Sequence, residues 1–232
     1  MLLHVTPMKE PPAGYLTAKK PLPYAEHIFG TRTGTSIGAA TELLGPIAHM
    51  HQVHGNRLVY AETAGQYEDC DAIFTDQPNL WLAVKTADCT PVLISSPHAV
   101  AAVHLGWRST QSNLLQITID TLCRDFSQQP EDLHLALGPS LSQPNFEVET
   151  KFIDYFTVPN PQRFFAQGKD DQHVQMDLKG IIRGQAIAAG MLDIHIHTLP
   201  NCTYSEKNTF HSYRRDAANS GRQLSFIKLT AA

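Results

Sequence analysis

Three short apolar segments in close succession constrain the fold of this chain more than any other feature. They cover Leu80 to Val84, Pro91 to Ile94 and Ala99 to Val103. Their length and β-branched content, with Pro and Ser between them, are typical of β-strands. The connection Ser95-Ser96-Pro97-His98 is short and rich in turn residues. We therefore expect the second and third segments to pair as an antiparallel hairpin.

This hairpin places two reactive side chains close together. Cys89 precedes one strand and His104 follows its partner, and antiparallel pairing sets the start of one strand beside the end of the next. A second histidine, His54, lies upstream in Gln52-Val53-His54-Gly55. A thiolate and two imidazoles form a three-ligand set that binds zinc or copper and leaves one coordination position open. The same side chains could instead activate a nucleophilic cysteine, so both interpretations stay open.

The rest of the chain mixes hairpins with helices, which predicts α+β packing. An apolar stripe of Leu115, Ile119, Leu122 and Phe126 predicts one amphipathic helix over Ser109 to Phe126. We also expect a glycine-rich loop with positive φ angles over 30–38, a helix over 148–156, a helix from the N-cap Asp177 to Gly190, and strands over 133–137, 194–199 and 224–229.

Length and composition favour one large domain. The chain has 232 residues, of which 42% are hydrophobic. It fits a single domain, 1–232, or two halves that share one sheet system and divide near residues 125–145. Five prolines in residues 1–24 predict an extended N-terminal segment. The net charge of −4 offers no basic surplus for nucleic acid. The sequence shows no signal peptide, membrane span or CxxC pair, so we expect a cytoplasmic protein with reduced thiols.

Other polar residues offer weaker candidate sites. His195 and His197 alternate with apolar residues, which is typical of a two-ligand metal site or of a solvated strand face. His49 and His51 would lie on one face of a strand, with His54 on the other. The segment from Ser212 to Asp216 could hold a phosphate through its arginines, or form surface ion pairs.

Six motifs in a fixed order resemble one known family. They are Gln52 to Gly55 (QVHG), Asp71 to Thr75 (DAIFT), Thr86 to Pro91 (TADCTP), His104 to Arg108 (HLGWR), Gly138-Pro139, and a C-terminal set of Cys202-Thr203, Ser212 to Asp216 and Gly221-Arg222. The family is the one called YfiH-like, laccase-domain, multicopper polyphenol oxidase or peptidoglycan editing factor. The resemblance covers the chain from about residue 28 to the end. It implies a layered α/β/β/α fold with internal duplication.

The resemblance also implies an enzyme and its site. His54, Cys89 and His104 occupy the family's metal positions, which are usually assigned to zinc and sometimes to copper. The implied reactions are phosphorolysis of adenosine, inosine and methylthioadenosine to base and ribose 1-phosphate, and deamination of adenosine. The partners are thus a nucleoside and phosphate. We expect Asp88, next to Cys89, to act as an acid/base beside the three metal ligands. We expect Arg32, Arg108, Arg214 and Arg215 to bind anions, and Trp107 to stack on the base.

Three alternatives remain beside this one. A metal-free cysteine hydrolase or amidase acting on peptidoglycan precursors would use Cys89 as nucleophile and His104 as base. Copper-dependent oxidation of phenols is disfavoured, because it needs more histidine ligands than one three-residue set supplies. A partner-binding module without enzymatic activity would not need Cys89 at all.

Overall fold

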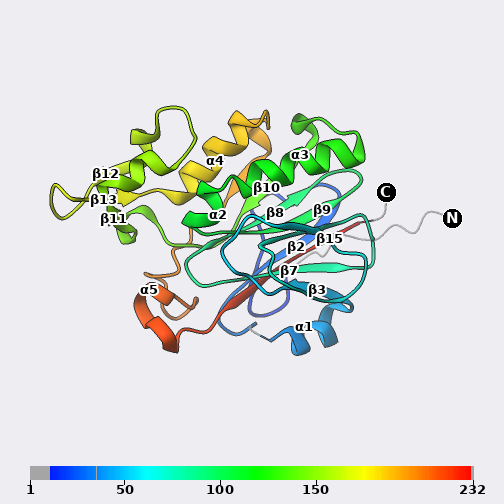
Figure 1. Ribbon diagram of the computed structural model, residues 1–232. Helices are drawn as coiled ribbons and strands as arrows, with labels where there is room; N and C mark the ends of the chain where they lie inside the picture. Colours follow the sequence, from blue (N-terminus) through cyan, green and yellow to red (C-terminus); the bar gives the residue numbers. More distant parts are fainter. Residues whose placement is uncertain (1–10, 35, 231–232) are drawn as a thin grey trace.

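The structure, a computed structural model, describes residues 11–34 and 36–230. Two six-stranded β-sheets lie face to face (Figure 1). Several helices cover the outer face of one sheet, and a short helix, residues 37–44, lies against the outer face of the other (Figure 1). A separate three-stranded sheet lies near the helices of the upper layer (Figure 1). This arrangement confirms the layered α+β fold that we expected.

The first sheet brings together the two ends of the described chain. Its order is β1 (Tyr15–Leu16), β2 (Ala25–Gly30), β15 (Gln223–Leu229), β7 (Trp81–Thr86), β3 (Ile47–Met50) and β5 (Gly65–Tyr67). Strand β15 pairs antiparallel with both β2 and β7, so it lies inside the sheet rather than at its edge. Strand β3 runs parallel to β7. The C-terminal strand therefore joins the N-terminal strands to the middle of the chain.

The second sheet contains the predicted hairpin. Its order is β14 (Ile196–Thr198), β10 (His134–Leu137), β8 (Thr90–Ser95), β9 (Val100–Leu105), β6 (Ala72–Thr75) and β4 (Leu58–Tyr60). Strands β8 and β9 pair antiparallel, with Thr90 opposite Leu105 and Pro91 opposite His104. The hairpin prediction is confirmed, and its open end carries Cys89 and His104.

Three apolar cores separate the layers. The α-helices are α1 (Ile37–Leu44), α2 (Trp107–Gln111), α3 (Leu114–Phe126), α4 (Leu178–Ala188) and α5 (Tyr213–Asp216). Residues of α3 and α4 pack on the second sheet, residues of both sheets form the middle core, and residues of α1 pack on the first sheet. The third sheet consists of β11 (Glu147–Glu149), β13 (His173–Met176) and β12 (Phe165–Gln167). Short 3-10 helices are η1 (Pro130–Asp132), η2 (Gln143–Asn145), η3 (Thr150–Tyr155), η4 (Pro161–Phe164), η5 (Asp193–His195) and η6 (Ala217–Asn219).

Two helix predictions were wrong in part or in full. The helix expected over 109–126 is divided into α2 and α3, because Asn113 adopts a left-handed conformation with φ of 59°. The helix expected over 148–156 does not form. Its first residues make strand β11, which pairs with β13, and the following residues form η3. Here strand pairing with a distant segment overrides the local apolar pattern.

The predicted N-cap Asp177 and the predicted end of its helix before Gly190 are confirmed. The Asp177 side chain accepts a hydrogen bond from the Gly180 N–H and caps α4, and Gly190 follows the helix with φ of 97°. In the glycine-rich stretch 30–38, by contrast, no glycine has a positive φ. Gly30 instead allows close approach of β15, since a Cβ there would lie 2.2 Å from the Leu224 carbonyl oxygen.

Each large sheet draws its strands from widely separated parts of the chain. Each large sheet contains strands from both sides of residues 125–145, since β15 follows them in the first sheet and β14 follows them in the second. We infer that the chain forms one domain. Of the N-terminal segment, residues 11–24 hold only the short β1, and residues 1–10 lie outside the described part. Among the described residues, no helix combines the length and apolar character that crossing a membrane requires.

Candidate metal centre

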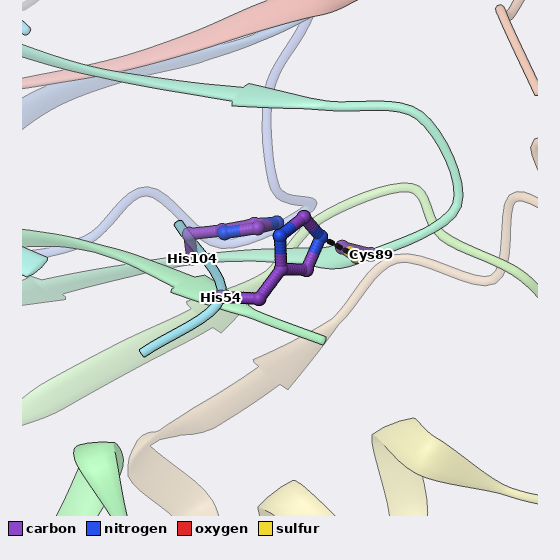
Figure 2. Close-up of side chains that lie close together, drawn as sticks. All are labelled: His54, Cys89 and His104. Atoms are coloured by element: carbon purple, nitrogen blue, oxygen red, sulfur yellow. Dashed lines mark hydrogen bonds between the residues drawn. The ribbon is translucent and has the colours of Figure 1, made fainter. Parts of the chain in front are cut away.

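Three side chains from separate parts of the chain meet at the open end of the β8–β9 hairpin (Figure 2). His54 lies in the loop after β3, Cys89 in the loop between β7 and β8, and His104 in β9. One ligand atom from each lies within 4.8 Å of the others. The Cys89 Sγ is 3.9 Å from His54 Nε2. The structure thus brings together the three residues that the sequence singled out.

A buried carboxylate holds the loop that carries His54. Asp71 is 0% exposed and precedes β6. Its two oxygens accept hydrogen bonds from the backbone N–H groups of Val53 (3.1 Å), His54 (2.9 Å) and Gly55 (2.7 Å). His54 has φ of 61°, a conformation that side-chain-bearing residues rarely adopt. These three hydrogen bonds stabilise that backbone and fix the direction of the imidazole.

The same carboxylate orients the second histidine. Asp71 Oδ1 lies 2.7 Å from His104 Nδ1, and both side chains are buried. With Nδ1 donating to Asp71, Nε2 is the ring atom left to bind a metal. Asp71 was not among the predicted site residues. The available signal was a charged residue directly before the apolar strand Ala72 to Thr75.

The environment favours the ionised form of Cys89. Burial opposes ionisation, but the charge of His104 and hydrogen bonds from His104 and His54 outweigh it, and the pKa of Cys89 falls to about 6. Burial also opposes ionisation of His104 and lowers its pKa. The Cys89 thiolate and the Asp71 carboxylate outweigh this effect and raise the pKa of His104 to about 9. Both shifts favour the thiolate–imidazolium form of the pair, and a cation would replace the imidazolium proton.

The donor set fits a zinc or copper ion. In a tetrahedral site with metal–nitrogen and metal–sulfur bonds of normal length, nitrogen and sulfur ligands lie roughly 3.5 Å apart. The observed 3.9 Å between Cys89 Sγ and His54 Nε2 is close to this value. Gly106 leaves the necessary space, since a Cβ there would lie 2.9 Å from Cys89 Sγ. Thiolate and imidazole ligands suit both metals, so the donor set does not select one.

The three side chains line a cavity of about 490 Å³. This volume lies in the range of small-molecule sites. The other lining residues include a set of cations and a set of aromatic rings. These are Lys85, Arg108, Arg214 and Arg222, and Trp107, Phe146 and Tyr213. Trp107 packs edge-on against Phe152, with ring centroids 5.0 Å apart, and the Arg108 guanidinium lies 4.3 Å from the Trp107 ring. The cavity thus combines flat apolar walls with positive charge.

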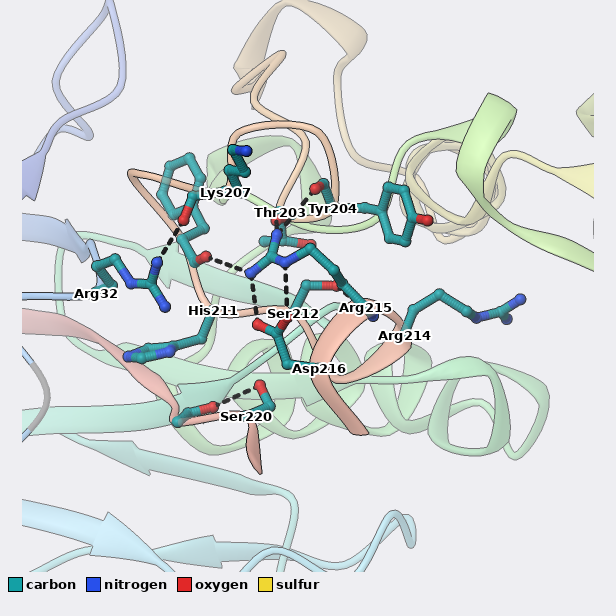
Figure 3. A network of polar contacts seen from close by, with 12 residues as sticks. Arg32, Thr203, Tyr204, Lys207, His211, Ser212, Arg214, Arg215, Asp216 and Ser220 are labelled. Atoms are coloured by element: carbon teal, nitrogen blue, oxygen red, sulfur yellow. Dashed lines mark hydrogen bonds and ion pairs between the residues drawn. The ribbon is translucent and has the colours of Figure 1, made fainter. Parts of the chain in front are cut away.

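The predicted substrate residues divide into two groups. Trp107, Arg108 and Arg214 line this cavity, whereas Arg32 and Arg215 line a separate hollow. Arg32 and Arg215 thus lie apart from the other predicted substrate residues, and their part in substrate binding stays a prediction. Figure 3 shows Arg215 at the centre of a polar network, with Arg214 directed away from it. Four other lining residues were not predicted as site residues, because their approach depends on how distant loops fold: Lys85, Phe146, Tyr213 and Arg222.

Arg215 has a structural role. Its guanidinium donates to the carbonyl oxygens of Thr203 and Tyr204 (2.9 Å each) and of Phe210 (3.0 Å), and it pairs with Asp216 at 2.7 Å. Arg32 donates to the carbonyl oxygen of Lys207. These contacts fold the C-terminal loop against itself and leave the Arg215 guanidinium no free edge for phosphate.

Within residues 11–34 and 36–230, the other histidines form no comparable centre. His195 ends η5 and does not share a strand with His197, so the predicted alternation fails. The His195 ring packs against His134, with centroids 3.9 Å apart. His51 lies near Glu68 and Asp69, 3.5 and 3.0 Å from their carboxylates, but all three side chains are exposed. Exposed groups of this kind are common without a metal ion.

Known proteins resemble this chain in sequence. It is 32% identical to a purine nucleoside phosphorylase from Deinococcus radiodurans over 211 residues, which are 90% of this chain and 78% of that protein. It is also 30% identical to adenosine deaminase RL5 from an unknown prokaryotic organism, over 72% of this chain and 64% of that protein.

The fold has a solved counterpart. The crystal structure of YlmD from Geobacillus stearothermophilus superimposes with a TM-score of 0.88 at 23% identity, over 96% of this chain and 98% of that one. The model of one protein family, described as multi-copper polyphenol oxidoreductase laccase, matches residues 33–230. The chain belongs to this laccase-domain family, whose members include the YfiH and YlmD proteins.

Proposed function

We propose that the protein is a metal-dependent purine nucleoside phosphorylase that also deaminates adenosine. The substrates would be adenosine, inosine and S-methyl-5′-thioadenosine. The single observation that carries the proposal is the convergence of His54, Cys89 and His104 at one wall of a cavity that also holds cations and aromatic rings. The names of the relatives, purine nucleoside phosphorylase and adenosine deaminase, support the choice of reaction.

Phosphorolysis requires the site to hold both inorganic phosphate and the purine base. An oxygen of inorganic phosphate forms a bond to ribose C1′ while the bond from C1′ to the purine nitrogen breaks, and the base leaves with that electron pair and takes up a proton. The four cavity cations supply charge to hold the phosphate, and Arg108 and Arg214 are our choices for this contact. Trp107 supplies a flat surface for the purine.

The three ligands would hold the metal beside these subsites. A bound zinc or copper ion would supply a Lewis acid at one wall of the cavity. Asp71 keeps Nε2 of His104 available through the hydrogen bond to Nδ1. In deamination, the oxygen of water replaces the amino group of adenosine and ammonia is released, so the same purine subsite would serve both reactions.

A metal-free cysteine hydrolase is the second candidate, and one observation favours it. Asp71, His104 and Cys89 follow one another as carboxylate, imidazole and thiolate, with Asp71 2.7 Å from His104 Nδ1. Such a chain can activate a nucleophile. However, it has no use for His54, whose Nε2 lies 3.9 Å from the same sulfur and whose loop Asp71 also holds. A second imidazole on the thiolate is expected of a metal site.

The test combines metal analysis with an assay of base release. We expect nearly one zinc or copper ion per chain in freshly purified protein, and release of adenine from adenosine only when phosphate is present. The variants His54→Ala, Cys89→Ala and His104→Ala should lose both the metal and the activity. His98→Ala is the matched control, because His98 is exposed in the β8–β9 turn, at the opposite end of the hairpin from Cys89 and His104.

The two candidates differ in their response to chelation. Stripping the metal should abolish base release, and adding back zinc should restore it. Full activity of metal-free protein, lost on alkylation of Cys89, would favour the hydrolase. Base release by Cys89→Ala equal to that of wild type would contradict the role of Cys89 in both enzymes. No enzymatic activity in metal-loaded or metal-free wild type would instead leave the partner-binding module.

A further inference from the structure

Asp88 adopts a backbone conformation that is rare for a residue with a side chain. Its φ is 85°, in the region that side-chain-bearing residues rarely adopt. Such a residue persists only where surrounding contacts hold it. Asp88 directly precedes Cys89 and lines the cavity. The surrounding contacts therefore indicate what this conformation accomplishes.

Both carboxylate oxygens of Asp88 are occupied by distant parts of the chain. Oδ1 accepts a hydrogen bond from the Thr203 hydroxyl, and Oδ2 accepts one from the backbone N–H of Arg214, each at 2.6 Å. Thr203 is 0% exposed. The carbonyl oxygen of Asp88 also accepts from the Leu141 N–H at 3.0 Å. Asp88 thus connects the metal-ligand loop, the loop that carries Cys89, to three residues elsewhere in the chain: Thr203, Arg214 and Leu141.

The hydrogen bond to Arg214 has consequences for the cavity. Tyr213 and Arg214 both line it, and both side chains are exposed at its wall. The Arg214 guanidinium donates to the Glu147 carbonyl oxygen at 3.2 Å and lies 5.4 Å from the Phe146 ring. The Asp88 carboxylate therefore fixes the backbone of Arg214, while Glu147 and Phe146 contact its guanidinium.

The network of Arg215 supports the same segment from the other side. Its bonds to the carbonyls of Thr203, Tyr204 and Phe210 keep residues 203–216 compact (Figure 3). Thr203 takes part in both arrangements, since its hydroxyl binds Asp88 and its carbonyl binds Arg215. The segment is therefore attached to the metal-ligand loop at two adjoining points, Thr203 and Arg214.

We propose that Asp88 is a positioning residue, which fixes Arg214 at the phosphate side of the cavity, and not the acid/base that its place beside Cys89 suggested. The inference rests on the proposed function for the identity of the anion. A proton carrier needs an oxygen that is free to reach the substrate. Both Asp88 oxygens instead accept short hydrogen bonds from fixed donors, and charge-assisted bonds of this length are among the strongest in proteins.

The test compares Asp88→Asn with Arg214→Ala and with the double variant. Asn retains one accepting oxygen, for Thr203, and presents an N–H group to the Arg214 N–H. We expect the KM for inorganic phosphate to rise roughly 10-fold, as for loss of one charge-assisted hydrogen bond, with kcat within about 3-fold of wild type. In the double variant the effect should be no larger than in Arg214→Ala alone, because Asp88 acts through Arg214. A large fall in kcat at unchanged KM would overturn the proposal.

Hydrogen exchange of the Arg214 amide supplies a readout that does not need activity. In wild type this amide should be protected by Asp88, and in Asp88→Asn it should exchange at least about 10-fold faster. Unchanged exchange would overturn the proposal whatever the kinetics show. Thr203→Val, which removes only one of the two hydrogen bonds, should give a smaller change in the same direction, and it serves if Asp88→Asn does not fold.

Failure of the proposed function would appear differently. If wild type released no base in phosphate buffer, phosphorolysis would be excluded, while exchange at Arg214 and calorimetric binding of inorganic phosphate would still test Asp88. Metal content should match wild type in Asp88→Asn. Asp125→Asn is the control, since Asp125 pairs with its neighbour Arg124 at the end of α3, away from the cavity-lining residues.

Discussion

Asp71 is the residue on which the two histidine ligands depend most directly. Its carboxylate accepts hydrogen bonds from three consecutive backbone N–H groups, Val53 to Gly55, and from His104 Nδ1. Each oxygen of this buried carboxylate thus accepts two hydrogen bonds, so both oxygens are fully satisfied. The pKa of Asp71 is accordingly lowered: burial raises it, but the hydrogen bonds from His104 and from the Gly55 and Val53 backbone outweigh this effect.

Replacing Asp71 by Asn should therefore weaken the metal site without removing a ligand. The amide NH₂ would face backbone donors, and His104 would lose the acceptor that orients it. We expect metal affinity to fall by roughly 10- to 100-fold, measured by competition with a chromogenic chelator. Asp69→Asn is the control, because the Asp69 carboxylate is exposed and contacts His51 instead. Equal affinity of Asp71→Asn and wild type would contradict this role.

Gly106 offers a second test, based on space instead of charge. A Cβ at this position would lie 2.9 Å from Cys89 Sγ and 3.4 Å from His54 Cδ2. The backbone itself, with φ of −87° and ψ of 178°, accepts alanine. Gly106→Ala should hence displace two ligands and lower metal affinity by about 10-fold or more, with little change in the free energy of unfolding of the metal-free protein.

The control for this substitution is also a glycine beside the site. A Cβ at Gly55 would meet Asp71 Oδ2 and Val53 Cγ2 only at 3.6 Å, an ordinary van der Waals distance. Gly55→Ala should bind metal like wild type in the same chelator competition. If both variants behaved alike, crowding of the sulfur would not be the explanation.

The candidate site shows what sequence alone can predict at this scale. Cys89 and His104 could be placed together because a short hairpin joins them, and His54 because its motif resembles the family's. Asp71 was missed, since its role depends on loop N–H groups and on β6 lying next to β9. The resemblance could not separate Arg214 from Arg215: adjacent in sequence, they point to different sides of the segment (Figure 3).

At the level of elements, local signals predicted local structure. Hairpin β8–β9 and the Asp177 cap of α4 each depend on residues close in sequence, and both are confirmed. Strand β11 was mistaken for a helix, because its pairing with β13 joins residues 147–149 to 173–175. No periodicity within 148–156 reports such a partner.

Four histidines lie near one another at one edge of the two-sheet sandwich: His27, His134, His195 and His197. His27 of β2 is 6% exposed, and burial, together with the charge of His197, lowers its pKa to about 4. His134 of β10 also has its pKa lowered to about 4, by burial and by His195 and His197. Between pH 6.5 and pH 4, the unfolded chain thus binds protons that the folded chain does not. The free energy of unfolding must then fall as the pH is lowered through this window.

His27→Gln should reduce this pH dependence. Glutamine does not titrate, and its oxygen can accept the hydrogen bond that Ala18 N–H gives to His27 Nε2. From pH 7 to pH 5, wild type should lose about 2 kcal/mol more unfolding free energy than the variant, measured by urea denaturation of both proteins. The exposed His98 provides the control: His98→Gln should lose as much as wild type. A pH dependence unchanged by His27→Gln would contradict the burial of a neutral His27.

For the whole molecule, strand β15 has the largest consequence. It is the last strand of the chain, yet it lies between β2 and β7 in the first sheet. The second sheet likewise takes strands from both sides of residues 125–145, and the core between the sheets draws residues from both. Neither sheet can therefore lose its partner without exposing that shared core, which favours unfolding as a single unit.

The two tryptophans test this unity, because they report on different layers. Trp81 is 2% exposed in β7 of the first sheet, whereas Trp107 begins α2 beside the metal centre on the second. Each becomes the only tryptophan in the variant that replaces the other by phenylalanine. If the chain is one domain, fluorescence of Trp107 in Trp81→Phe should have the same denaturant midpoint as the circular dichroism of that variant, and likewise for Trp81 in Trp107→Phe. Added zinc should shift both fluorescence midpoints upward together, since a ligand that binds only the folded state stabilises the whole cooperative unit. A shift confined to Trp107 would show that the layers unfold separately.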